Sequence, residues 1–181
     1  QWRRWLNKKA SKNDNYFTQW SNFLKSKELK DLSSEYSTVF MIHPELEDKS
    51  NFFDIPKYIK ILQYSDLGAM KLQEQINQTK IMITDFSSIA VDYAIAGADI
   101  LYFQFDRDEY YNNHTIKKGW FDYDLDGFGP VFFNTRNLTE YIRRLSKEDK
   151  TNREIYKKRL NDLILDDYQM IETPSQNVYQ Q

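Results

Sequence analysis

The sequence predicts an α/β domain: a Rossmann-like parallel sheet flanked by helices. Short apolar runs typical of buried strands alternate along the chain with segments whose apolar residues recur at helical spacing. This alternation is typical of parallel βα units. The chain has 181 residues, with no internal repeat or low-complexity segment, so we expect one domain over residues 1–181.

Each predicted element rests on a local pattern. Strands are expected over residues 38–42, 58–66, 80–84 and 99–105, and helices over 14–30, 68–79 and 87–97, followed by a helical tail over about 135–181. Pro44 cannot continue a strand ladder, and Gly97 is placed to close a helix. On the helix at 68–79 we expect Met70, Leu72 and Ile76 to form the apolar side.

The composition excludes several classes of function. The chain carries 25 basic and 27 acidic residues, a net charge of −2, which gives no general reason to bind nucleic acid. It has no cysteine, so it can form neither a disulfide nor a thiolate metal site. No apolar run is long enough to span a membrane, and no signal peptide is recognisable. Because it begins at Gln1 without Met, we expect a piece of a longer protein.

The stretch KIMITDFSSIAVDYA, residues 80–94, places chemistry-bearing side chains where a buried strand turns into a helix. Ligands of open α/β sheets bind beyond the carboxyl ends of the strands. A helix that starts there offers free backbone N–H groups to a phosphate, and Ser87 and Ser88 add hydroxyl donors. The alternative is that Asp85 or Ser87 only caps the helix. The motif by itself does not distinguish these interpretations.

An ordered series of motifs resembles the CDP-glycerol:poly(glycerophosphate) glycerophosphotransferases, which include teichoic acid polymerases and related capsule-making enzymes. The series is FMIHP, IMITDFSSIAVDYAIAGADILYFQFD, EYY, KKGWFDYDLDGFGP and DDYQMIETPSQNVY. The similarity is strong over roughly residues 38–135 and weaker in the tail. QWRRWL resembles the segment that opens the second half of such enzymes.

The resemblance implies a fold and a reaction. The fold is GT-B, two Rossmann-like domains, of which this chain is the C-terminal, donor-binding half. A polyol phosphate, glycerol or ribitol phosphate, moves from a CDP-activated donor to a hydroxyl of a growing teichoic acid or capsule polymer, and CMP leaves. The implied partners are the CDP-polyol, the polymer acceptor, the N-terminal domain of the same protein and the cytoplasmic membrane surface, where the enzyme is peripheral. We expect no cofactor, no metal site, and no catalysis by this half alone.

The resemblance also assigns candidate catalytic residues. His43 matches the family's His-Pro histidine beside the donor phosphates, where a charged ring stabilises the leaving phosphate and a neutral ring accepts a proton. Asp85 matches the carboxylate of the family's T-D-Y-S-S segment, in which Phe86 replaces the tyrosine. Like charges repel, so Asp85 is expected to accept from a donor hydroxyl or to orient His43 rather than to touch phosphate.

A second group matches the positions that contact the donor. Its members are Thr84, Ser87, Ser88, Asp106, His114, Lys118 and Gly119. Lys118 stands where the family often has arginine, so it keeps the charge but loses the two-pronged guanidinium. His114 is either a donor or acceptor contact or a surface loop residue.

Two other interpretations remain open beside the transferase. A sugar transferase of the same fold would use a nucleotide sugar, and a non-catalytic domain would bind a protein or the membrane surface. Competition between CDP-polyols and UDP- or GDP-sugars distinguishes the sugar transferase from the polyol-phosphate transferase. Absent nucleotide binding favours the non-catalytic domain. DYDLDG, residues 122–127, copies the start of an EF-hand loop, but Phe133 stands where that loop needs a glutamate.

Overall fold

The computed structural model describes Arg3, Leu6, residues 10–113, Gly119, residues 121–145 and residues 150–169. The α-helices are α1 (Asn15–Leu24), α2 (Lys27–Leu32), α3 (Ala69–Gln78), α4 (Ala90–Ile95), α5 (Arg107–Asn113), α6 (Thr135–Leu145) and α7 (Lys150–Gln169). The strands are β1 (Val39–Ile42), β2 (Lys60–Gln63), β3 (Ile81–Thr84), β4 (Asp99–Phe103) and β5 (Val131–Phe132). Two 3₁₀ segments, η2 (Pro44–Phe52) and η3 (Tyr64–Asp66), flank β2.

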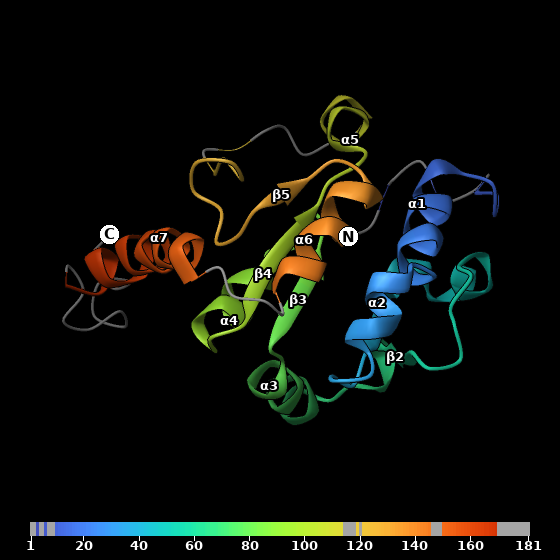
Figure 1. Cartoon of the computed structure of the whole chain (residues 1–181), viewed down its shortest axis with the longest axis horizontal. Helices are drawn as coiled ribbons and strands as arrows, with labels where there is room; N and C mark the ends of the chain where they lie inside the picture. Colours follow the sequence, from blue (N-terminus) through green and yellow to red (C-terminus); the bar gives the residue numbers. More distant parts are fainter. Residues whose placement is uncertain are drawn as a thin grey trace, which may run out of the picture.

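All described strand pairs are parallel, and they form two sheets (Figure 1). In the first sheet β1 pairs with β2, with Val39 opposite Lys60. The second has the order β3-β4-β5, with Ile81 opposite Asp99 and Tyr102 opposite Val131. This confirms the α/β class with parallel strands and flanking helices. The single sheet that we expected is divided, and a shared core rather than a continuous ladder joins the two parts.

Strand β4 divides the core into two layers because successive side chains point to opposite faces of a sheet. Leu101 and Phe103 enter one buried cluster, and Ile100 and Tyr102 enter the other. The β1–β2 sheet contributes Ile42 to the first cluster. The three-stranded sheet is therefore covered on both faces, as a buried parallel sheet must be.

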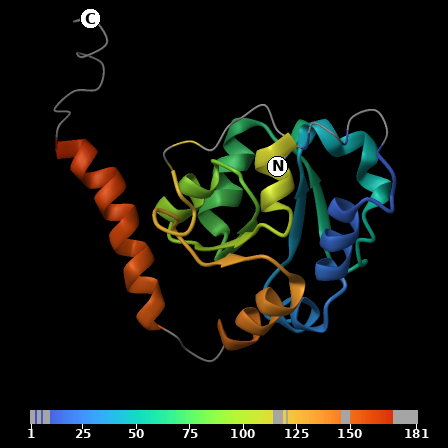
Figure 2. The same ribbon diagram turned by 90° about the horizontal axis from the view of Figure 1, so that it is seen from above.

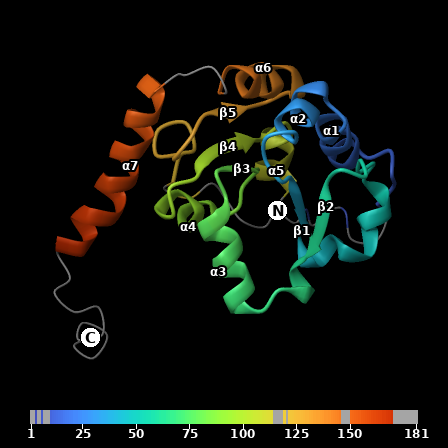
Figure 3. The same cartoon turned by 60° about the horizontal axis from the view of Figure 1, so that its bottom comes forward.

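Different helices cover the two faces. Helices α1, α2 and α6 supply the first cluster, and α6 contacts both α2 and β4. Helices α3 and α4 supply the second, and α7 adds Leu160 and Leu163 to its edge. Figure 2 shows α7 at the periphery of the molecule, and Figure 3 shows β1 and β2 beside β3 and β4.

Most element predictions are confirmed, and the deviations have local causes. The expected helix over 14–30 is broken after α1, where the Ser26 hydroxyl accepts from the Leu29 N–H and starts α2. Gly97 closes α4 at φ +89°, a conformation that glycine adopts without strain. Met70 was assigned wrongly to the apolar side of α3: it is 81 % exposed, whereas Ile76 is buried.

Four elements were not predicted. Helix α5 is built from polar and tyrosine-rich sequence, η2 has no clear periodicity, and β5 is only two residues long. The fourth, η3, occupies the end of the strand expected over 58–66, of which only Lys60–Gln63 is a strand. Strand β5 exists because two backbone hydrogen bonds hold it to β4. The Tyr102 N–H of β4 donates to the Pro130 carbonyl, just before β5, and the Gln104 N–H, just after β4, donates to the Phe132 carbonyl. Pairing with a buried strand, rather than local propensity, creates it.

The approach to β5 requires a glycine. A Cβ atom added at Gly129 would lie 1.7 Å from the Ile100 carbonyl oxygen, which belongs to the backbone of β4. The chain before β5 therefore runs against the strand closer than any side chain permits. At Gly119 an added Cβ would meet nothing within 4 Å.

We predict that Gly129→Ala lowers the free energy of unfolding by about 2–4 kcal/mol, because the methyl group forces β5 away from β4. Urea unfolding followed by tryptophan fluorescence measures the change. Gly119→Ala is the matched control and should change stability by about 0.5 kcal/mol or less. Equal midpoints for the two variants would contradict the close approach.

Candidate active site

The sequence-predicted residues follow the ends of strands β1, β3 and β4. His43 follows β1, Asp85 follows β3, and Asp106 lies three residues after β4. His43 is near enough to Asp85 and Arg3 for both charges to influence its pKa. The structure therefore brings His43, Asp85 and Asp106 to one region, at the edge where α/β sheets bind ligands.

Arg3 joins the two carboxylates. Its Nε lies 2.7 Å from Asp106 Oδ2 and its Nη2 lies 3.0 Å from Asp106 Oδ1, so the contact is two-pronged. The same Nη2 is 3.0 Å from Asp85 Oδ2. All three side chains are at least 98 % buried. Asp85 and Asp106 are thus ion-paired with one buried arginine. The sequence did not predict this arrangement.

Aromatic rings enclose the guanidinium of Arg3. Its Cζ lies 5.0 Å from the centroid of the Tyr16 ring, 5.1 Å from that of Phe86 and 4.7 Å from that of Tyr110. Phe86 and Tyr110 stack face to face, with centroids 4.0 Å apart. Rings favour a planar cation through their quadrupoles and exclude the water that would weaken its ion pairs.

The electrostatics of the cluster favour full charge on its members. Burial alone raises the pKa of Asp85, but neighbouring positive charge, including Arg3, and the Phe86 N–H at 2.8 Å hold it well below its ordinary value. Burial lowers the pKa of Arg3, yet the attraction of Asp85 and Asp106 leaves it raised above the usual value. Both shifts favour the charged forms, so at neutral pH Asp85 is a carboxylate and Arg3 a cation.

Ser87 and Ser88 lie in a turn ahead of α4 rather than in its first helical turn. The Ala90 N–H bonds to the Ser87 carbonyl and the Val91 N–H to the Ser88 carbonyl. The N-cap position belongs to Ile89, and no side chain caps the helix. The interpretation of Asp85 or Ser87 as a helix cap is therefore wrong. Ser87 is half-buried and Ser88 exposed, while Thr84 is buried at the end of β3.

His43 is half-buried and is the N-cap of η2, where its Nδ1 accepts from the Glu45 N–H at 3.2 Å. A neutral imidazole carries one proton, so this bond places the proton on Nε2. Partial burial lowers the pKa of His43 below its ordinary value, although Asp85 acts in the opposite direction. At neutral pH the ring is uncharged and offers Nε2–H as a hydrogen-bond donor.

A hollow of about 440 Å³ opens beside this cluster, beyond the end of β4. Its lining includes Gln104, Asp106, Arg107 and Phe133. Sequence reasoning missed Arg3, Gln104 and Arg107. Gln104 left a usable signal, since it is a polar residue inside the apolar run LYFQF, and Arg3 left a weaker one, among tryptophans in QWRRWL.

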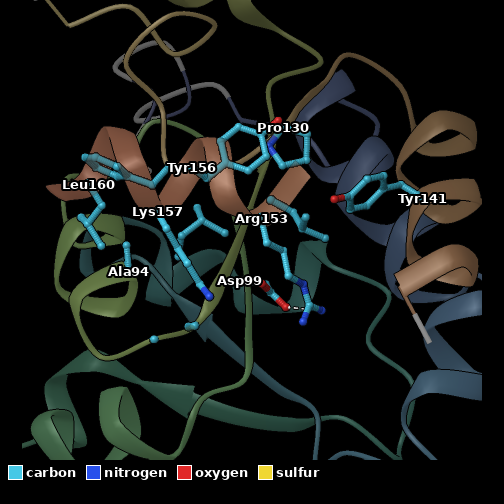
Figure 4. Close-up of a pocket in the computed structure, with 13 residues that line it drawn as sticks. Ala94, Asp99, Pro130, Tyr141, Arg153, Tyr156, Lys157 and Leu160 are labelled. Carbon is cyan, nitrogen blue, oxygen red and sulfur yellow. Dashed lines mark ion pairs between the residues drawn. The ribbon is translucent and has the colours of Figure 1, made fainter. Parts of the chain in front are cut away.

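A smaller cavity of about 80 Å³ lies away from the predicted site (Figure 4). It is formed where α7 meets the amino end of β4, and Arg153 crosses it to bind Asp99 at 2.8 Å. No predicted catalytic or donor-binding residue lines it. Its size and place indicate a packing gap between helix and sheet.

Some expectations concern residues outside the described part of the chain. His114 and Lys118 are among them, and Gly119 is described as an exposed residue. Among the described residues there is no group of three or more His, Cys, Asp or Glu side chains placed to hold a metal ion. In the same part of the chain, no helix has both the length and the apolar character that a membrane span needs.

Comparison with known proteins identifies the relatives of this chain. The sequence model described as CDP-Glycerol:Poly(glycerophosphate) glycerophosphotransferase matches residues 5–167. The Minor teichoic acid biosynthesis protein GgaB of Bacillus subtilis (strain 168) is 26 % identical over 83 % of this chain and 16 % of its own length. The Teichoic acid poly(ribitol-phosphate) polymerase of Bacillus spizizenii is 32 % identical over 68 % of this chain and 18 % of its own length.

A third relative, the Teichoic acid glycerol-phosphate primase of Bacillus spizizenii, is 24 % identical over 54 % of this chain and 24 % of its own length. The chain thus spans no more than 24 % of the length of these curated relatives. No solved structure matches it significantly.

We predict that Arg3→Met lowers the free energy of unfolding by about 3–5 kcal/mol, because two buried carboxylates lose their shared cation. The pKa of Asp85 is depressed in the folded state, so its stabilising contribution is complete above the ordinary value of 3.8 and declines as the pH falls below it. The difference between wild type and Arg3→Met should therefore shrink in acid.

Urea unfolding between pH 7 and pH 3 measures both effects. Lys27→Met is the control: its ion pair with Asp31 is on the surface, with the lysine 82 % exposed, and its loss should leave the midpoint unchanged. A loss of stability for Arg3→Met no larger than that of the control would show that the buried cluster is not stabilising.

Proposed function

We propose a function from one premise: the chain belongs to the CDP-glycerol:poly(glycerophosphate) glycerophosphotransferase family. The chain supplies the donor-binding half of an enzyme that transfers a polyol phosphate from a CDP-activated donor to a hydroxyl of a growing teichoic acid or capsule polymer, releasing CMP. The observation that carries this proposal is the position of His43 and of the Asp85–Ser88 turn after strands β1 and β3, with His43 near Asp85.

In this proposal His43 stabilises the leaving phosphate. Because the Glu45 N–H occupies Nδ1, the neutral ring presents Nε2–H, which is a donor and not a base. For His43 to accept the acceptor alcohol's proton on Nε2, the proton of the ring would first have to move to Nδ1, and the bond from the Glu45 N–H would be lost. The alcohol is then deprotonated by a group elsewhere in the enzyme, consistent with a site made from two halves.

The Ser87–Ser88 turn is proposed to bind the donor phosphates. Neither hydroxyl is used to cap α4, and both residues are at least partly accessible. Charge-assisted bonds from hydroxyls to phosphate oxygens are among the stronger hydrogen bonds in proteins. Thr84 would support the turn from the end of β3, and Gly119, His114 and Lys118 are proposed as further donor contacts on the basis of the family alone.

Asp85 and Asp106 are proposed to position the site without contacting the donor. Both are buried against Arg3, so their contribution is to hold the turn and the strand ends at the edge of the site. Asp85 also places a negative charge near His43, which tends to raise the pKa of the ring. For Asp85, this proposal keeps the expectation that a carboxylate does not touch phosphate. For Asp106, it replaces the expected contact with the donor by a positioning role.

The remaining partners follow from the same reaction. The polymer acceptor and an N-terminal domain of the same protein complete the site, which is proposed to use the GT-B arrangement of two Rossmann-like domains. The enzyme is proposed to work at the cytoplasmic face of the membrane as a peripheral protein. Calorimetry of the intact protein with CDP-glycerol, CDP-ribitol, UDP-glucose and GDP-mannose tests the proposal. Tighter binding of a nucleotide sugar than of either CDP-polyol would overturn it in favour of a sugar transferase.

We predict that His43→Ala lowers the rate of CMP release by about 10²–10⁴ fold while leaving the melting curve and most donor affinity intact, since the variant removes one hydrogen bond that stabilises the transition state. The assay follows CMP release by the intact protein. Normal release would remove His43 from the mechanism. Abolished release together with an early melting transition would make its role structural.

We predict that Ser87→Ala with Ser88→Ala weakens binding of the CDP-polyol by about 1–3 kcal/mol for each hydrogen bond to phosphate that the variant removes. Stability should change by about 1 kcal/mol or less, because neither hydroxyl caps α4. Calorimetry beside a melting curve separates the two effects. Unchanged affinity with a large fall in melting temperature would show that the serines are structural.

A further inference from the structure

A buried amide holds the backbone at the start of the Asp85–Ser88 turn. Gln104 follows β4 and is fully buried. Its Nε2 donates to the Asp85 carbonyl oxygen at 2.9 Å, and its backbone N–H donates to Phe132 at 2.8 Å. The Asp85 carboxylate is held separately by Arg3. The turn is thus anchored by its main chain and by its side chain through two independent groups.

Arg107, the first residue of α5, determines which way the amide of Gln104 faces. Its Nε and Nη2 donate to Gln104 Oε1 at 2.8 and 2.5 Å. If the amide turned over, its NH₂ group would face the guanidinium N–H groups, donor against donor, and the Asp85 carbonyl would face an oxygen. The fork of Arg107 therefore keeps the NH₂ group on the turn.

The other end of Arg107 reaches the loop at 122–127. Its Nη1 bonds to Asp124 Oδ2 at 2.5 Å, and its Cζ lies 4.7 Å from the centroid of the Phe133 ring. Within the loop, the backbone N–H of Asp122 donates to the Asp126 carboxylate and that of Asp124 to the Asp122 carboxylate. These bonds give the loop a defined shape at the point where Arg107 binds it.

The loop also touches the turn through a ring. Tyr123 packs edge-on against Phe86, with centroids 5.6 Å apart, and against Tyr102 of β4 at 5.0 Å. Loop and turn are therefore joined twice: by Tyr123 on Phe86, and by the chain of bonds from Asp124 through Arg107 and Gln104 to the Asp85 carbonyl. A displaced loop must therefore strain or release the Asp85–Ser88 turn.

We propose that Gln104 and Arg107 are positioning residues that couple the 122–127 loop to the Asp85–Ser88 turn and so set the place of Ser87 and Ser88. This inference rests on the proposed function for its consequence in catalysis, but the coupling itself is a property of the fold. Neither residue needs to touch the donor. A turn displaced by about 1 Å is enough to lower turnover by up to about a hundredfold.

The decisive variant is Arg107→Lys, which keeps a positive charge for Asp124 but loses the fork that orients the amide. Gln104→Leu removes the amide at similar size, and Arg144→Lys on the exposed end of α6 is the matched control. Hydrogen–deuterium exchange of the intact protein, without any ligand, reports on the backbone amides of residues 86–90. We expect these amides to exchange faster in Arg107→Lys and in Gln104→Leu, and at the wild-type rate in Arg144→Lys.

Kinetics of the same proteins give the second readout. If the two residues act as one relay, Arg107→Lys and Gln104→Leu should each lower kcat/KM for the CDP-polyol by about tenfold to a hundredfold. The double variant should lose no more than the worse single variant, because the same coupling is already broken. Additive losses, or unchanged exchange at residues 86–90, would overturn the relay.

The outcomes separate this inference from the proposed function. Faster exchange at the turn in the relay variants, together with a wild-type protein that neither binds nor turns over a CDP-polyol, would sustain the relay and reject the function. An active wild type whose Arg107→Lys variant keeps its exchange and its kcat/KM would do the reverse. If Gln104→Leu fails to fold, Asp124→Asn, at an exposed position, takes its place and should produce the same exchange pattern more weakly.

Discussion

A guanidinium buried between two carboxylates holds the proposed active edge of this protein together. Arg3, which precedes α1 in the chain, lies at the ends of β3 and β4, where it binds Asp85 and Asp106. Removing three charges from water is costly, and the cost is offset only because the geometry is two-pronged and the rings around the cation exclude solvent.

Aromatic packing around Arg3 also holds the Asp85–Ser88 turn in place. Phe86 belongs to the turn, stacks on Tyr110 of α5, lies against Arg3 and receives the edge of Tyr123 from the loop. One ring thus links the turn to α5, to Arg3 and to the 122–127 loop. Compared with the tyrosine that the resemblance implies at this position, Phe86 lacks a hydroxyl but keeps the ring surface that these contacts use.

The carboxylates and the hydroxyl and imidazole donors at this edge of the sheet differ in how they are placed. The carboxylates of Asp85 and Asp106 are turned inward onto Arg3. The Ser87 and Ser88 hydroxyls and the Nε2–H of His43 are neutral donors at the same edge. A pyrophosphate repels carboxylates and is favoured by such donors. The arrangement is consistent with the proposed binding of the donor phosphates at this edge.

Local patterns determined the strands β1, β3 and β4, the helices α3 and α4, and the position of the Asp-Phe-Ser-Ser segment at a strand end, because each follows from the spacing of apolar residues along a few turns of chain. The tertiary structure alone decided which charges meet. Arg3 and Asp106 are 103 positions apart, and no local periodicity links them. For the same reason β5, the exposure of Met70 and the inward turn of Asp85 depend on neighbours brought close only by folding.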